Sequence, residues 1–444
     1  MSYRLPSETQ YSEHIARLGR LHSDAASEAG FDAVIIGAGF QRYRFLDDQP
    51  YPFAVCPHFQ WWAPLDNAPG SFLCIRPGQR PGLWFHQPED YWHKPPEMPS
   101  GAWIGEFDLS ILRFPVEAKA LIPANAAFLG EPFEGIEGWG FKAVNPPALV
   151  HRLHWARAAK TPYELACMRV AARKGARAHV AAAAAFHRGA SEYGIHLAYL
   201  AASGHTEASL PYPNIIALNE GGAILHYTEL QADTPAERRS FLIDAGAQFR
   251  GYACDITRTH AAVPGGRFGD LVEALDAAQL RMCALVRAGT HYPDIHAAAH
   301  RMIAEILEEQ GIVRCSADAA VATRLTSVFF PHGIGHLLGL QVHDIGGHQE
   351  SPAGGSRPPP QEDRYLRLTR TLEAGTVVTI EPGIYFIDLL LAEARRDGRG
   401  HDIVWDVVEE LKPYGGVRVE DDVVATNGAP ENLTRDAFGE FAAA

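Results

Sequence analysis

Two aspartates stand beside short apolar runs of this 444-residue chain, where charged side chains are uncommon. Asp244 ends the run Phe-Leu-Ile-Asp, and Asp255 follows eleven residues later, so the pair flanks an expected pair of strands. If the chain turns at 249–250, the two carboxylates lie directly opposite each other, about 5 Å apart on one face. Facing carboxylates repel each other unless a cation lies between them. Two solvated strand aspartates would also explain the pair taken alone, but the apolar flanks favour a buried cation site.

Three histidines fall within twelve residues, at 332, 336 and 343. The spacing of His332 and His336 is typical of zinc ligands on a helix, but the glycines at 333 and 335 disfavour a helix there. No glutamate follows His332, so the sequence also lacks the metalloprotease pattern His-Glu-x-x-His. A glycine-rich loop that brings imidazoles close to a ligand explains the segment better.

Two glutamates end β-branched runs. Glu381 ends the run 376–381 and is followed by Pro382 and Gly383, which places it at a strand terminus beside a turn. Glu420 ends the run 417–420 and shares a strand face with Arg418, because side chains alternate along a strand. Either glutamate alone would more often be a surface residue than a ligand.

The elements that position these residues follow from capping signals and periodicity. Thr161, Pro162 and Glu164 form a capping box with a proline start, which predicts a helix from 162 to 188. Ser191 is expected to cap a second helix that ends near 202, and two more helices are expected at 268–288 and 293–310. Strands are expected at 241–244, 252–262, 376–381 and 417–420. Two helices followed by a strand pair, repeated, predict an α+β domain with internal pseudo-symmetry.

The capping box at Thr161 also marks the expected domain boundary, with a smaller α/β domain at 1–158 and a larger α+β domain at 159–444. The first domain should contain a strand at 32–36. Gly37 and Gly39 after this strand resemble the start of a dinucleotide fingerprint, but Arg42 replaces its third glycine, so nucleotide binding is not expected. The proline-rich and glycine-rich stretch 349–361 is expected to be a surface loop.

Composition excludes several classes of function. A formal net charge of −14, with no basic patch, argues against binding nucleic acid and weakly against an anionic membrane surface. No run approaches the roughly 20 apolar residues of a membrane span, and the polar first residues show no signal peptide. The six cysteines are scattered without a Cys-x-x-Cys pair, which favours reduced thiols in a cytoplasmic protein.

The motifs that contain these residues resemble, in sequence and in order, those of the metal-dependent aminopeptidase P and prolidase family. The matching motifs are Asp-Ala-Gly at 244–246, Asp-Ile-Thr-Arg-Thr at 255–259, Pro-His-Gly-Ile-Gly-His at 331–336, Thr-Ile-Glu-Pro-Gly-Ile-Tyr at 379–385 and Gly-Val-Arg-Val-Glu-Asp at 416–421. The resemblance covers residues 30 to 435 and is strongest to proteobacterial Xaa-Pro dipeptidases. It implies the pita-bread fold of creatinases and aminopeptidases for the catalytic domain.

The resemblance also implies a dinuclear metal site. Asp255 and Glu420 would bridge two divalent cations, Asp244 would bind one of them, and His336 with Glu381 would bind the other. Four carboxylates and one imidazole form an oxygen-rich site suited to Mn²⁺, with Co²⁺ and Zn²⁺ as alternatives. All five ligands are present in this sequence, which argues against the metal-free creatinase branch of the fold.

The implied reaction is hydrolysis of an Xaa-Pro dipeptide by a metal-bridging hydroxide, with Glu381 moving the proton to the leaving nitrogen. The other implied residues act on the substrate. The family match assigns His226, His332 and His343 to substrate holding and oxyanion stabilisation, Arg418 to the bridging carboxylate or the substrate, and Arg367 to the substrate carboxylate. Tyr212, Tyr292, Val342 and Leu366 are candidates for the proline pocket, with core packing as the alternative for each. Asp47, reaching from a neighbouring subunit, would make a homodimer part of the restriction to dipeptides.

Two other functions share these residues. Relatives in the family hydrolyse phosphotriesters and other organophosphorus compounds at the same metal pair, and aminopeptidase P cleaves longer Xaa-Pro peptides. A non-catalytic binding protein on the peptidase fold is a third reading, and the loss of a metal ligand would distinguish it. This sequence has lost none of the five.

Overall fold

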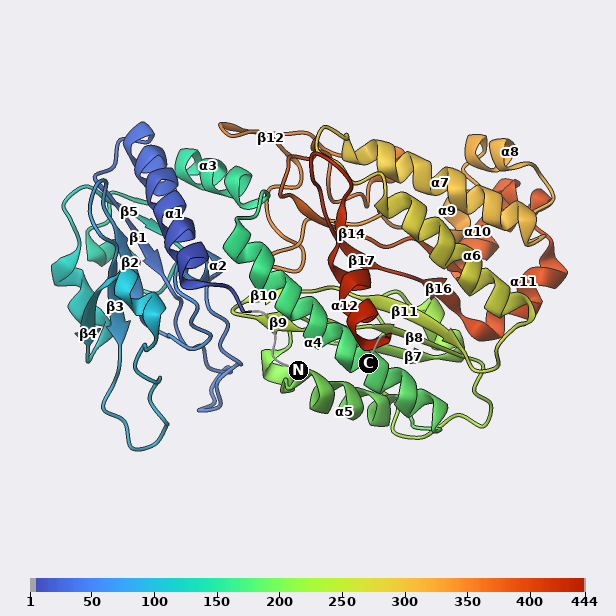
Figure 1. Ribbon diagram of the computed structural model, residues 1–444, viewed down its shortest axis with the longest axis horizontal. Helices are drawn as coiled ribbons and strands as arrows, with labels where there is room; N and C mark the ends of the chain where they lie inside the picture. The colour runs from blue at the N-terminus through green and yellow to red at the C-terminus, as the bar shows by residue number, and fades with distance from the viewer. Residues whose placement is uncertain (1–4, 443–444) are drawn as a thin grey trace. The chain divides into compact units, whose positions relative to one another are not determined.

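The computed structural model describes residues 5–442, so the first four residues of the polar N-terminus lie outside the described part. The chain forms two compact units. The first unit holds the residues up to Cys167 together with Phe249–Tyr252 and Gln349–Ser356, and the second holds the rest. The predicted α+β class is confirmed, and Figure 1 shows the element order from blue to red.

A six-stranded mixed sheet forms the core of the first unit, in the order β4-β3-β2-β1-β5-β6. β1 matches the strand expected at 32–36, and no helix follows Gly39, since the next helix starts at Pro57. The central strand β1 is buried throughout, because apolar side chains cover both faces. The bounds are α1 Glu8–Glu28, β1 Ala33–Gly37, α2 Pro57–Gln60, β2 Phe72–Ile75, β3 Gly82–His86, β4 Asp108–Leu112, β5 Ala126–Leu129, β6 Ala143–Val144 and α3 Pro147–Arg157.

The second unit begins its core with two helices on a three-stranded sheet, in the order β11-β8-β7, and the first of these helices starts within the first unit, which extends to Cys167. The predicted capping box is present: the Glu164 carboxylate accepts from the Thr161 backbone N–H at 2.8 Å, and Thr161 Oγ1 accepts from the Glu164 backbone N–H at 3.3 Å. Ser191 caps the second helix as expected. These elements are α4 Pro162–His187, α5 Glu192–Ser203, β7 Ile215–Leu218, β8 Ser240–Asp244 and β11 Thr257–Ala261.

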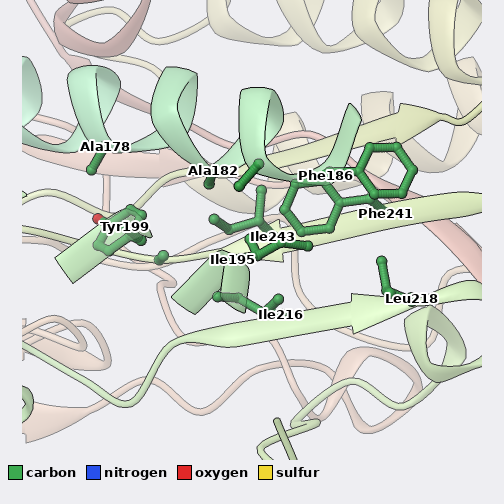
Figure 2. Close-up of a cluster of buried hydrophobic side chains, with 11 residues drawn as sticks. Ala178, Ala182, Phe186, Ile195, Tyr199, Ile216, Leu218, Phe241 and Ile243 are labelled. Carbon is green, nitrogen blue, oxygen red and sulfur yellow. The ribbon is translucent and has the colours of Figure 1, made fainter. Parts of the chain in front are cut away.

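An apolar core fixes the direction of β8. Figure 2 shows Ala182 and Phe186 of α4 and Tyr199 of α5 packed over the strands. The ring of Phe186 stacks on that of Phe241, one residue into β8, with their centroids 5.1 Å apart. Because alternate residues of this strand are committed to the core, its last residue, Asp244, is held in one orientation.

A second pair of long helices lies in the rest of the second unit. α6 packs against α7 and contacts β11, β14 and β16, and α6 and α7 lie side by side in Figure 1. The bounds are α6 Gly266–Cys283, α7 Tyr292–Glu309, α8 Ala317–Ala322, α9 Thr326–Phe329, β14 Val377–Ile380, β15 Gly383–Tyr385, α10 Asp388–Asp397, α11 Trp405–Leu411, β16 Gly416–Arg418, β17 Asp421–Val424, β18 Glu431–Asn432 and α12 Leu433–Ala442.

Three local predictions were wrong. The helix expected at 268–288 ends at Cys283, because the backbone N–H groups of Ala288 and Gly289 donate to Thr426 and Leu372 instead of continuing the helix. The stretch 349–361 is not an irregular loop throughout, since β12 Gln349–Ser351 and β13 Gly354–Ser356 form a hairpin.

The third error concerns the register of the two aspartates. Asp244 lies opposite Thr257 rather than Asp255. The hairpin formed by β9 Gln248–Phe249 and β10 Tyr252–Ala253 turns at Arg250 and Gly251, where φ is +53° and +83°. A two-residue hairpin turn with both φ values positive favours glycine at its second position, which places the turn one residue later than expected. The register therefore shifts by two residues, and a shift of two leaves Asp255 on the same face as Asp244.

Among residues 5–442, no helix is both long enough and apolar enough to cross a membrane.

Candidate metal centre and active site

A cavity of about 660 Å³ in the second unit collects most of the residues singled out by the sequence. That volume lies within the range of small-molecule sites. Its polar lining includes the four carboxylates of Asp244, Asp255, Glu381 and Glu420 and, among five histidines, the imidazole of His336. Its apolar lining comes from Leu225, Leu366, Ile387, Leu389 and Leu390.

The two aspartates reach a common point although they are not directly opposite each other. The hydroxyl oxygen of Tyr212 lies 2.9 Å from Oδ1 of Asp244 and 2.5 Å from Oδ1 of Asp255. A phenol carries one proton, so it donates to one carboxylate at a time. The two acidic oxygens are therefore gathered around a single donor, which leaves their other lone pairs available to a cation.

His336 completes the cluster from a different part of the chain. Its Nε2 lies 3.4 Å from Oδ2 of Asp255 and 3.8 Å from Oε1 of Glu381. Its Nδ1 lies 3.0 Å from the carbonyl oxygen of Leu337, an arrangement that assigns the proton to Nδ1 and leaves Nε2 as the ligand atom. The ligand atoms of Asp255, His336 and Glu420 all lie within 4.8 Å of one another.

Backbone contacts with β14 position His336. The predicted absence of a helix at 331–343 is confirmed. Instead, the His336 carbonyl accepts from the Thr379 backbone N–H, and the Ile334 carbonyl accepts from that of Glu381. A Cβ on Gly335 would lie 2.1 Å from the carbonyl oxygen of Thr379, so only glycine permits this approach. The glycine-rich segment thus places His336 beside Glu381 at the end of β14.

Burial and mutual repulsion make the ionised carboxylates of this cluster unfavourable in the absence of cations. Burial raises the pKa of Glu381 to about 7 and holds that of Glu420 well above its ordinary value, and neighbouring carboxylates add to both shifts. Burial likewise raises the pKa of Asp244, although Arg418 opposes it. Burial opposes ionisation of Asp255, yet its contact with His336 keeps its pKa below the usual range. Buried carboxylates that repel one another are stabilised by divalent cations, so these residues fit a metal centre.

A hydrogen-bonded chain runs from Asp244 to His332. Arg418 Nη2 donates to Asp244 at 2.7 Å, and Nη1 donates to the hydroxyl oxygen of Tyr385 at 3.0 Å. His332 Nδ1 lies 2.8 Å from the carbonyl oxygen of Gly333, so its Nε2 accepts from the Tyr385 hydroxyl at 2.9 Å. Burial lowers the pKa of His332 to about 3, so the imidazole is neutral. Both nitrogens of His332 are therefore engaged by protein groups in this arrangement.

Thr257 links the two ends of the cluster. It is fully buried, its hydroxyl donates to Oε2 of Glu420 at 2.7 Å, and its oxygen accepts from Nε of Arg418 at 3.2 Å. The backbone also pairs Thr257 with Glu420. Neither Thr257 nor Tyr385 was singled out from the sequence, although both lie inside motifs that carried the resemblance.

The structure separates the remaining candidate residues into two groups. His226, His343, Arg367 and Leu366 line the cavity. Three others do not line it in the described part of the chain: the Tyr212 hydroxyl contacts the aspartates, the Tyr292 hydroxyl donates to Thr379 at 2.9 Å, and Val342 is half-buried outside the lining. Asp47 is exposed and belongs to the first unit.

Comparison with known proteins gives a consistent family assignment for both parts of the chain. Residues 9–155 match the profile described as Xaa-Pro dipeptidase, N-terminal domain, and residues 166–427 match that of metallopeptidase family M24. An Xaa-Pro dipeptidase of Xanthomonas euvesicatoria pv. vesicatoria is 50% identical over 431 residues, which cover 96% of this chain and 97% of the relative. An Xaa-Pro dipeptidase of Xanthomonas campestris pv. campestris is 51% identical over 431 residues, which again cover 96% of this chain and 97% of the relative.

Solved structures share the fold at low sequence identity. An aminopeptidase of Pseudomonas aeruginosa is 23% identical, with a TM-score of 0.72 over 97% of this chain and 98% of its own. Aminopeptidase P of Escherichia coli with the inhibitor Pro-Leu is 22% identical, with a TM-score of 0.73 over 99% of both chains. The expected fold, with a pita-bread catalytic domain after a smaller domain, is thereby confirmed.

Proposed function

The chain belongs to metallopeptidase family M24 and, within it, to the Xaa-Pro dipeptidases, and from this premise we propose that it hydrolyses the peptide bond before the C-terminal proline of dipeptides. The observation that carries the proposal is the cavity in which four carboxylates and His336 converge. The 50% identity over 96% of the chain supports the same substrate class.

We propose that two divalent cations, Mn²⁺ foremost, bind between these side chains. Asp255 and Glu420, which with His336 place ligand atoms within 4.8 Å, would bridge the two cations. Asp244 would bind one cation, and His336 with Glu381 the other. Bound there, the cations would lower the pKa of a water molecule and polarise the substrate carbonyl.

The protein's own groups would handle protons and charge around that carbonyl. Glu381, which lines the cavity with Oε1 3.8 Å from Nε2 of His336, would accept the proton of the attacking water and return it to the leaving nitrogen. His226 and His343 line the cavity and would hold the substrate and its developing oxyanion. Arg418 would hold Asp244 and, through Tyr385, the orientation of His332. A direct role for His332 in substrate contact requires its ring to release one of its two partners.

Substrate recognition would come from one wall of the cavity. Arg367 would pair with the free carboxylate of the dipeptide, a task that suits a guanidinium. Leu366 would face the prolyl ring, while Tyr212, Tyr292 and Val342 would shape that pocket from behind. Asp47 would limit the N-terminal side from a neighbouring subunit, in a homodimer. The exposed loop around Asp47 favours such a partner contact, because Phe45 and Leu46 are each 90% exposed.

We further propose a cytoplasmic location and a domain boundary between residues 158 and 159. The six cysteines are all unpaired, which suits a reducing compartment. The two profile matches, which end at 155 and resume at 166, support the boundary.

The decisive experiment compares kcat/KM of the metal-reconstituted protein for four substrates: an Xaa-Pro dipeptide, an Xaa-Ala dipeptide, an Xaa-Pro tripeptide and a phosphotriester. The proposal requires the Xaa-Pro dipeptide to be the best substrate by at least about tenfold. Faster cleavage of the tripeptide would reassign the protein to the aminopeptidase P activity, and a preferred phosphotriester would make it an organophosphorus hydrolase.

Metal analysis of Asp255→Asn tests the bridging assignment directly. Loss of a bridging carboxylate should reduce bound metal and lower kcat/KM by about 10³-fold or more. Asp270→Asn, at an exposed position of α6, is the matched control and should retain both metal and activity. Two metals held at wild-type affinity by Asp255→Asn would contradict the bridging role.

A further inference from the structure

One short segment provides much of the substrate side of the cavity. Arg364, Tyr365, Leu366 and Arg367 are consecutive, and all four line it. They follow directly after a single 3₁₀ turn, η6 Gln361–Asp363. The position of Asp363 therefore sets where this wall begins, and the groups that hold Asp363 influence where the substrate's carboxylate can bind.

Asp363 is held by two basic side chains from elsewhere in the same unit. Arg324 donates to Oδ1 of Asp363 and, at 3.0 Å, to the carbonyl oxygen of Glu362. His296 of α7 places Nε2 3.5 Å from the same Oδ1. His296 is 3% exposed, and its Nδ1 has no hydrogen-bond partner among the described residues. The polar contact that the structure gives this buried imidazole is thus with Asp363. The hydrogen bond from His296, together with Arg324, lowers the pKa of Asp363, so it is a carboxylate at neutral pH.

The wall beyond Asp363 has little freedom to move independently. The Leu366 backbone N–H donates to the Asp363 carbonyl at 2.8 Å, and the Leu366 carbonyl oxygen lies 2.9 Å from Nε2 of His348. A Cβ on Gly333 would lie 2.9 Å from Cα of Leu366, and one on Gly347 would lie 2.3 Å from the carbonyl oxygen of Arg367. Because backbone packs on backbone at both points, the segment has little room to relax, and a displacement of Asp363 strains the contacts of Leu366 and Arg367.

We propose that the junction of His296, Asp363 and Arg324 is a positioning element for the substrate: it fixes the 364–367 wall so that Arg367 meets the dipeptide's free carboxylate. The proposal rests on the proposed dipeptidase function and deepens it. None of the three junction residues lines the cavity among the described residues, so their effect is indirect and acts through the wall. The selectivity for a free carboxylate is the property that depends on them.

A metal site is the competing reading of the same residues. His296 and His300 are one helical turn apart, and with Asp363 they place ligand atoms within 4.8 Å of one another. Two observations favour the positioning role instead. The Arg324 guanidinium already neutralises the carboxylate that a cation would need, and the Thr326 hydroxyl lies 2.7 Å from Nδ1 of His300. A divalent cation beside this guanidinium would be repelled.

The test uses six variants of the metal-loaded, full-length protein: the four described next, Arg367→Gln, and Arg367→Gln combined with Asp363→Asn. Asp363→Asn and His296→Leu remove the charge and the imidazole. His296→Gln keeps an N–H donor near the position of Nε2. Asp318→Asn is the matched control, because Asp318 forms an exposed ion pair with Arg301 on the same helix α7. Each variant is assayed with Ala-Pro and with Ala-Pro amide, which lacks the free carboxylate, and its bound metal is counted.

We expect KM for Ala-Pro to rise about tenfold in Asp363→Asn and His296→Leu, with kcat within about twofold and bound metal unchanged. His296→Gln should bring KM for Ala-Pro most of the way back to the wild-type value, and Asp318→Asn should have the wild-type KM. KM for the amide should stay constant. The double variant of Asp363→Asn and Arg367→Gln should have nearly the same KM for Ala-Pro as Arg367→Gln alone.

Three results would overturn the proposal: unchanged KM values, KM rising equally for the acid and the amide, or kcat falling together with bound metal. Loss of one metal equivalent in His296→Leu with the activity retained would make the residues a metal site instead. A wild-type protein that cleaves neither substrate would contradict the dipeptidase function itself, a distinct failure.

Discussion

Thr257 shows how a single hydroxyl can serve a metal centre without being a ligand. Its O–H donates to Glu420, and its oxygen accepts from Arg418, which in turn holds Asp244. The hydroxyl therefore orients one candidate ligand directly and another through a guanidinium. Groups of this kind commonly contribute tenfold to a hundredfold in metal affinity.

Thr257→Val should therefore weaken metal binding without abolishing it. Valine has nearly the same shape, so the buried position stays filled, while the Glu420 carboxylate loses its donor. We expect metal affinity to fall by about 10- to 100-fold, measured by competition with a chelator. Thr257→Ser keeps the hydroxyl and should remain close to the wild type. Equal affinities for all three proteins would show that Thr257 does not orient the ligand.

At this scale, the sequence predicts chemistry better than it predicts geometry. Asp244, Asp255 and His336 could be recognised because their motifs are long and specific, and the structure brings them into one cavity. The register between the strands that carry the two aspartates could not be predicted, because it depends on which residues form the turn. Arg250, a non-glycine residue with φ of +53°, gives little sequence signal for that conformation.

At the scale of elements, the contact between the 334–337 segment and β14 determines the site. The two segments exchange backbone hydrogen bonds, and Leu337 pairs with Val378. The contact is close at Gly335, where φ is +153° and a Cβ would also lie 2.6 Å from the hydroxyl of Tyr292. Tyr292, whose hydroxyl donates to the Thr379 carbonyl oxygen, therefore supports this approach.

Gly335→Ala should accordingly separate the segment from β14. The methyl group has no space beside Thr379, so we expect a loss of more than about 3 kcal/mol in the free energy of unfolding, together with loss of bound metal. Gly269→Ala, in the interior of α6, is the control, since a Cβ added there would meet no atom within 4 Å. It should stabilise the protein by about 0.5–1 kcal/mol, because alanine favours a helix. Urea unfolding measures both changes, and a stable, metal-binding Gly335→Ala would refute the close approach.

Elements with local signals were the ones the sequence predicted well. α4 and α5 carry their own caps at Thr161 and Ser191, so their starts could be identified. The end of α6 could not be identified in this way, because residues 284–289 have a helical composition. They leave the helix because Arg287 pairs with Thr426. Contacts between distant parts of the chain override local propensity in such segments.

At the scale of the whole molecule, the two units should respond differently to metal removal. All five candidate ligands, from Asp244 to Glu420, belong to the second unit. A cation that binds only the folded state stabilises the unit that holds it, by an amount that grows with its concentration. We expect calorimetry with a chelator to lower the transition of the catalytic unit by several degrees and to leave that of the first unit in place. Equal shifts of both would show one cooperative unit and count against the boundary at 158.

Acidity should destabilise the first unit through a buried histidine. His22 is fully buried, its Nδ1 lies 2.9 Å from the Leu18 carbonyl oxygen, and its Nε2 accepts from the indole N–H of Trp62 at 3.3 Å. Burial lowers its pKa to about 4, against about 6.5 in the unfolded chain. Between these two values the unfolded state binds a proton that the folded state does not, so stability falls as the pH drops from about 6.5 to about 4.

The difference of about 2.5 pKa units corresponds to roughly 3 kcal/mol across that window, with no contribution to the slope above pH 7. His22→Gln can keep a donor toward Leu18 and an acceptor for Trp62 but cannot titrate. Its free energy of unfolding should therefore depend on pH less steeply between 6.5 and 4 than that of the wild type, while the two slopes coincide above pH 7. Urea unfolding of the first unit at a series of pH values, with chelator present to remove the contribution of the metal ligands, measures the two slopes. Parallel curves through the acid window would mean that His22 is protonated in the folded protein, against the hydrogen bond that it accepts from Trp62.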